Sequence, residues 1–167
     1  MKLSLKRLIA YWLDFVILAV VLVGVQLLLY TVTSGFPFDY FDKGFEIESW
    51  VVLSMSLPVW AYFISFEKAR RQTLGKRLLK LVVVDERKST LSFVQALGRT
   101  FVRLLPWELT HLIILVPDPW WDVEEPSNQA LIFIPNLLIV AYIVVLFANK
   151  GRRGIHDYVA RTKVKEL

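Results

Sequence analysis

The chain has 167 residues, of which 56% are hydrophobic, and its formal net charge is +5. Soluble domains are usually about 45–50% apolar, so this composition argues against a soluble globular protein and favours a membrane protein. Cysteine is absent, which excludes disulfides, thiol catalysis and thiolate metal sites.

The first apolar run covers residues 8–30 and is interrupted only by Asp14 and Gln26. About 20 apolar residues in a helix cross the hydrocarbon core of a bilayer, so this run predicts a membrane-spanning helix. It is longer than the apolar core of a cleavable signal peptide, and we expect it to stay in the mature protein. A carboxylate inside such a helix is costly, so Asp14 must be protonated, paired or hydrated.

Two further runs predict membrane-spanning helices, at residues 50–66 and at residues 130–148. The first of them is followed by a polar insert, residues 67–92. Within the insert, residues 78–84 are rich in β-branched side chains and precede turn-forming polar residues. This stretch is either a strand or a helix that lies on the membrane, because its periodicity extends over too few residues to decide.

The remaining apolar run is too short to cross a bilayer unless its helix begins earlier in the chain. A helix over residues 93–116 would span, with the long side chains of Arg99 and Arg103 reaching the headgroups. The alternative is an amphipathic helix over residues 91–105 that bends near Pro106 into a short or tilted crossing.

The chain ends in a polar tail, residues 149–167, in which His156 and Asp157 are adjacent. One adjacent His-Asp pair with no second cluster is a weak metal signal. A turn in which Asp157 pairs with Arg152 or Arg153 is favoured instead. The sequence therefore predicts no metal site and no cofactor.

Basic residues are segregated along the chain. All 20 lysines and arginines except Lys43 precede the first run, lie between the second run and Arg103, or follow the last run. The two other loops, residues 31–49 and 117–129, hold most of the acidic residues. Because basic residues near helix ends stay in the cytoplasm, we expect both termini and the insert to be cytoplasmic. An even number of crossings follows, which favours four.

The predicted fold is an all-α membrane protein with a single domain over residues 1–167. It has four transmembrane helices at about residues 8–30, 50–66, 93–116 and 130–148, a cytoplasmic amphipathic or interfacial insert at 67–92, and a cytoplasmic tail at 149–167. Its basic band should attract anionic lipid headgroups, at about 1 kcal/mol per basic residue near the surface. No nucleic-acid binding is predicted, because that would need aromatic residues interleaved with the charge on a soluble face.

Several motifs in order along nearly the whole chain resemble the RDD family of small bacterial membrane proteins. The matching positions are Arg7, Asp14, Gln72 to Lys76 with Val83 to Asp85, Arg99, Arg103, and Ile155 to Asp157 with Thr162 to Val164. One position differs from the family pattern: this chain has Arg161 before the threonine, where family members often carry a small residue. The resemblance implies a multi-pass protein of the bacterial cytoplasmic (inner) membrane. The molecular function of the family is poorly defined, with sodium/proton exchange among the proposals for some members.

Six ionisable residues form a predicted intramembrane charge cluster: Arg7, Asp14, Arg99, Arg103, Glu108 and His111. If the third helix enters the membrane near Leu104, Glu108 and His111 lie at the depth of Asp14, and the three side chains share one pocket. If that helix enters at Phe93, Arg99 lies at the depth of Asp14 instead. We favour the second arrangement, in which Asp14 forms a buried ion pair with an arginine.

These two arrangements correspond to two functions. The shared pocket of Asp14, Glu108 and His111 would suit cation/proton exchange, because desolvation favours the neutral acid until a cation arrives. However, four helices without a visible inverted repeat argue against an autonomous transporter. The favoured function is a non-enzymatic subunit or scaffold whose basic cytoplasmic face contacts anionic lipid, another membrane protein or a second copy of the chain. No nucleophile with a neighbouring base is discernible, so no enzyme is predicted.

Overall fold

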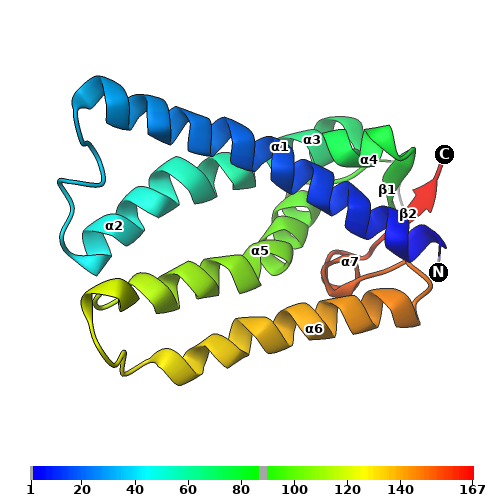
Figure 1. Cartoon of the computed structure of the whole chain (residues 1–167). Coiled ribbons are helices and arrows are strands. Elements are labelled where there is room, and N and C mark those ends of the chain that lie inside the picture. The colour runs from blue at the N-terminus through cyan, green and yellow to red at the C-terminus, as the bar shows by residue number, and fades with distance from the viewer. Residues whose placement is uncertain (1, 87–89) are drawn as a thin grey trace.

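Four long helices dominate the computed structural model, which describes residues 2–86 and 90–167 (Figure 1). The first is α1 (Lys2–Thr33). The second is a continuous helix made of α2 (Gly44–Val51), a π-helical turn (Val52–Ser56) and α3 (Leu57–Arg70). The third is α5 (Phe93–Leu115), and the fourth is α6 (Phe133–Ala148), which follows a 3-10 turn (Gln129–Ile132). Each of these four helical stretches is long and apolar enough to cross a membrane, as predicted.

The third crossing is one helix that begins at Phe93. Ser92 caps it, accepting a hydrogen bond from the Gln95 backbone, while the Gln95 side chain accepts one from the Ser92 backbone. Pro106 lies inside this helix and cannot donate to the carbonyl of Val102; the Tyr142 hydroxyl donates to that carbonyl instead, at 2.5 Å. The helix is continuous over nearly all of the predicted residues 93–116, and it also changes direction near the middle of its length, as the alternative expected (Figure 1).

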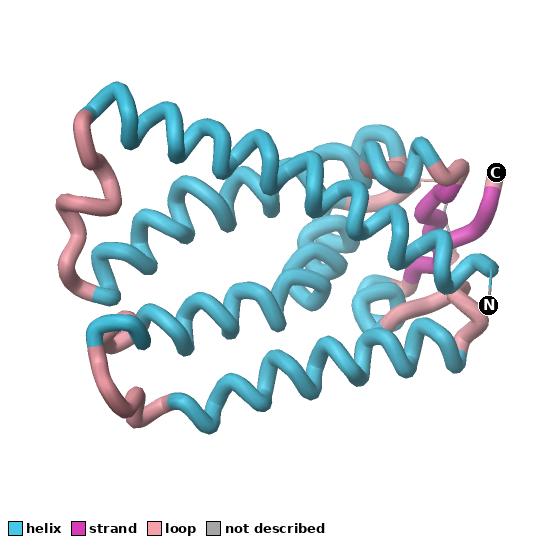
Figure 2. The backbone as a smooth tube through the Cα atoms, viewed as in Figure 1, coloured by secondary structure: helices cyan, strands magenta, loops and turns pink. Residues whose placement is uncertain are grey.

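Both chain termini lie at the same end of the bundle, together with the short elements (Figure 2). These are α4 (Leu74–Leu78), β1 (Leu81–Asp85), α7 (Ile155–Ala160) and β2 (Thr162–Glu166). The two strands pair antiparallel, with Val83 opposite Val164. The stretch at residues 78–84 is therefore mainly a strand rather than a membrane-surface helix. Residues 87–89 of the predicted insert lie outside the described residues.

A small apolar core joins this two-stranded sheet to the bundle. Leu81, Val83 and Val164 of the sheet pack with Ala10 of α1 and Ala96 of α5. Leu81, Val82 and Val83 of β1 are all buried, whereas β2 alternates, with Thr162 and Val164 buried and Lys163 and Lys165 exposed, the pattern that fixes a strand's register. The insert and the tail thus form a cap on one end of the bundle, which we call the basic end because the predicted basic band lies there.

Candidate functional site: a buried ionic network beside a cavity

Glu67, at the end of α3, is completely buried and is surrounded by three cations. Its carboxylate accepts hydrogen bonds from Lys76 of α4 at 2.5 Å, from Arg99 Nε at 2.9 Å and from Arg103 Nη2 at 2.7 Å. Burial lowers the pKa of Lys76 to about 8, although the charge of Glu67 opposes that shift. One carboxylate therefore holds α3, α4 and α5 together at the basic end.

Asp157 is the second buried carboxylate of this network. It pairs with Arg7 of α1 at 2.6 Å and with Arg99 of α5, and it also accepts a hydrogen bond from the backbone of Gly154. Burial by itself would raise the pKa of Asp157, but the charges of Arg99 and Arg7 outweigh it and hold that pKa well below its usual range. The expected pairing of Asp157 with Arg152 or Arg153 is wrong, because its partners come from α1 and α5.

Arg99 links the two carboxylates. Its Nε bonds to Glu67, and its Nη1 bonds to both Asp157 and Thr162. The expectation that Arg99 and Arg103 reach outward to lipid headgroups is wrong, since both side chains turn inward and are buried. A planar guanidinium with several donors suits this bridging position, which a lysine ammonium would fill less well.

Asp14 is also buried, but no arginine in the described part of the chain pairs with it. Its oxygens accept hydrogen bonds from the Tyr62 hydroxyl at 2.6 Å, the Thr73 hydroxyl at 2.5 Å and the Gly75 backbone at 2.7 Å. The favoured Asp14–arginine pair is therefore wrong. The close approach of α4 depends on Gly75, because a Cβ atom there would lie 2.1 Å from the carbonyl oxygen of Ala10.

Because its partners are neutral donors, Asp14→Asn should lower the free energy of unfolding only by about 1 kcal/mol, the usual net value of one hydrogen bond. The asparagine oxygen can still accept from Tyr62 and Gly75, and the Thr73 hydroxyl can turn to accept from the new amide. Thermal unfolding in detergent would measure the change. The ion-pair hypothesis would be restored by two results together: a loss of stability several times larger than this in Asp14→Asn, and recovery of that loss when Arg99→Gln or Arg103→Gln is added.

Glu108 and His111 lie in a separate cluster on another face of α5. Glu108 accepts hydrogen bonds from Ser56 at 2.9 Å and Trp60 at 2.8 Å, and His111 lies between Glu108 and Glu48, at 3.0 and 2.8 Å. None of these contacts involves Asp14, so the structure does not bring Asp14, Glu108 and His111 into one pocket. Ser56 ends the π-helical turn, a distortion that often accompanies functional positions.

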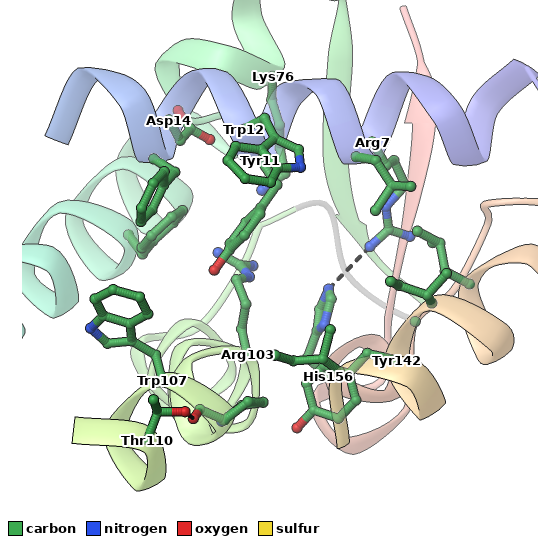
Figure 3. Close-up of a pocket in the computed structure, with 18 residues that line it drawn as sticks. Arg7, Tyr11, Trp12, Asp14, Lys76, Arg103, Trp107, Thr110, Tyr142 and His156 are labelled. Atoms are coloured by element: carbon green, nitrogen blue, oxygen red, sulfur yellow. Dashed lines mark hydrogen bonds between the residues drawn. The ribbon is translucent and has the colours of Figure 1, made fainter. Parts of the chain in front are cut away.

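A cavity of about 390 Å³ lies beside the network, between α1, α3, α5 and α6 (Figure 3). Its lining residues from these helices are mainly apolar and aromatic. Four polar side chains of the network, Arg7, Lys76, Arg103 and His156, line it as well. Asp14 also lines the cavity, although its oxygens bond to groups of α3 and α4 and to Thr73 between them.

Sequence reasoning found Arg7, Asp14, Arg99, Arg103, His156 and Asp157; it named Lys76 only within the motif Gln72 to Lys76, and it did not find Glu67. Glu67 follows the second apolar run directly, so it was assigned to the polar insert. One signal could have found Glu67. It is an acidic residue at the end of a predicted membrane helix, and the arginines expected inside the membrane need carboxylates as partners.

The model of the RDD family matches residues 3–161, which is nearly the whole chain and includes every charged residue of the network. No curated protein and no solved structure matches the chain.

Proposed function

Since the chain belongs to the RDD family, we propose that it is a non-enzymatic component of the bacterial cytoplasmic membrane whose basic end binds anionic lipid headgroups. In this proposal the basic end faces the cytoplasm, with both termini. The support is the segregation of lysine and arginine to that end, because basic residues near helix ends are retained in the cytoplasm.

The exposed basic side chains carry this proposal. Beyond the buried network, the following are exposed at or near the basic end: Lys2, Lys68, Arg70, Arg71, Arg77, Lys80, Lys150, Arg152, Arg161, Lys163 and Lys165. We call these residues the basic face. Two exposed carboxylates beside them are already paired, Glu86 with Arg153 and Glu166 with Lys6. The face therefore has excess positive charge, which attracts anionic headgroups by about 1 kcal/mol per basic residue.

The alternative, cation/proton exchange through a pocket shared by Asp14, Glu108 and His111, has no geometric support, because these residues lie in two separate clusters. An acidic membrane protein or an acidic surface of a second copy could also bind the basic face. A system that contains only the purified chain and lipid separates lipid binding from these possibilities.

Replacing Arg77, Lys163 and Lys165 by glutamine together should weaken binding of phosphatidylglycerol about a hundredfold, since three contacts at about 1 kcal/mol each are lost. The measurement is the rise in unfolding temperature as phosphatidylglycerol is added in detergent, because a ligand of the folded state stabilises it. Lys43→Gln is the matched control, as Lys43 is exposed but lies at the other end of the bundle. Equal stabilisation by phosphatidylcholine, or equal loss in the control, would contradict lipid binding by the basic face.

A further inference from the structure

The cavity beside the network is open to the bilayer between α1 and α6. Trp12 of α1 is 61% exposed and Ile143 of α6 is 41% exposed, although both line the cavity. Trp107 of α5 also lines the cavity and is 49% exposed. Because these side chains lie within membrane-spanning segments, the apolar part of the cavity faces lipid rather than water.

The lining is ordered along all three helices. On α1, Arg7 is nearest the basic end and is followed by Leu8, Tyr11, Trp12, Asp14 and Phe15. On α5, Arg103 is followed by Pro106, Trp107 and Thr110. On α6, Leu146 is nearest the basic end, with Ile143, Tyr142 and Ile139 further away. The cavity is thus cationic at its basic end and mostly apolar away from it. This is the polarity of an amphiphile with an anionic head.

Two hydrogen-bond donors of lining residues at the cationic end have no partner among the described residues. Arg103 Nη1 is one, while the guanidinium as a whole lies over the Phe63 ring at 4.7 Å. His156 Nδ1 is the other. Because arginine only donates, His156 Nε2 accepts from Arg7 at 3.0 Å, and this assigns the ring proton of neutral His156 to Nδ1. Buried donors without partners are rare and need a ligand or water to satisfy them.

The charges at this end do not cancel. Arg7, Lys76, Arg99 and Arg103 supply four positive charges, against three carboxylates, Glu67, Asp157 and Asp14. One positive charge is in excess when His156 is neutral and every carboxylate is ionised. A single monoanionic headgroup would balance it.

We propose that this cavity binds one anionic phospholipid, with its phosphate at Arg103 and His156 and one acyl chain along Trp12, Trp107 and Ile143. The proposal rests on the proposed function, since it gives the anionic lipid of the basic face one specific buried position. A volume of about 390 Å³ is within the usual range of ligand pockets, so it accommodates part of the lipid. The remainder, including the second chain, stays in the bilayer through the exposed opening.

Tryptophan substitutions on adjacent residues of α6 test the position of this lipid. Ile143→Trp fills the cavity, whereas Val144→Trp is the matched control, because Val144 is 59% exposed and does not line the cavity. Native mass spectrometry of the purified chain in a delipidating detergent would count retained lipids after addition of phosphatidylglycerol or of phosphatidylcholine with the same chains. The pair Ile139→Trp and Val140→Trp repeats the test if Ile143→Trp does not fold.

The wild type and Val144→Trp should each retain one phosphatidylglycerol, and Ile143→Trp should retain at least tenfold less. Glycerol phosphate added without acyl chains should not displace the lipid; displacement would overturn the phospholipid assignment in favour of a soluble phosphate ligand. Equal retention by the two variants would overturn the cavity site.

The basic-face variant separates the two proposals. The triple variant of Arg77, Lys163 and Lys165 should still retain the single tightly bound lipid. If both tryptophan variants retain lipid equally and the triple variant loses it, the basic face alone binds lipid and the cavity proposal fails. If the wild type shows no preference for phosphatidylglycerol over phosphatidylcholine, both proposals fail.

Discussion

Glu67→Gln should lower the free energy of unfolding by about 3–5 kcal/mol, because removal of one partner of a buried ion pair leaves charges buried without compensation. Three cations, Lys76, Arg99 and Arg103, depend on this carboxylate, and all are buried with it. Glutamine keeps the shape of the side chain but can accept from them with only one neutral oxygen. The measurement is chemical or thermal unfolding of the purified chain in detergent.

The control for this prediction is Glu86→Gln. Glu86 also pairs with an arginine, Arg153, but its side chain is partly exposed, and such pairs contribute about 0–1 kcal/mol. A second substitution, Arg103→Gln, should recover part of the stability of Glu67→Gln by removing one stranded cation. If Glu67→Gln and Glu86→Gln were equally mild, the network would not hold the helices together.

Gly75→Ala should destabilise the chain by roughly 3 kcal/mol or more. Its Cβ would lie 2.1 Å from the Ala10 carbonyl, so α4 must move away from α1. Overpacking of this kind typically costs ~1–3 kcal/mol, and the movement also weakens the bonds from Gly75 and Thr73 to Asp14, worth about 1 kcal/mol each. Comparison of unfolding midpoints in detergent measures the loss.

Gly98→Ala is the matched control, since Gly98 lies inside α5 and a Cβ there would meet nothing within 4 Å. Alanine favours a helix interior by roughly 0.5–1 kcal/mol over glycine, so this variant should be as stable as the wild type or more stable. A Gly75→Ala chain as stable as Gly98→Ala would show that α4 does not need the close contact with α1.

The four crossings were predictable because length, apolarity and charge distribution act over many residues at once. Even the weak third helix followed from the basic tail after it, which required one more crossing. The burial of Arg7 and Asp14 was also accessible, since both belong to the first predicted helix or its start. These are properties of single segments.

The partners of the buried charges were not predictable in the same way. Asp14 bonds to Tyr62, Thr73 and Gly75, and Asp157 bonds to Arg7, which is distant in the sequence. Such pairings depend on how helices rotate and on how closely α4 approaches α1. The depth of a residue along a helix does not say which way its side chain points around the helix axis. The depth estimate therefore placed Glu108 and His111 beside Asp14, although they contact α2, the π-helical turn and α3.

The ion pair between Arg7 and Asp157 also has a consequence for biogenesis. Arg7 is translated early, whereas Asp157, its buried counter-ion, lies close to the C-terminal end of the described chain. Glu67 precedes Arg99 and Arg103 in translation and can neutralise them as they emerge. Asp157, the counter-ion of Arg7, is present only once α7 has been synthesised. The first helix, α1, can therefore reach its final packing only after that.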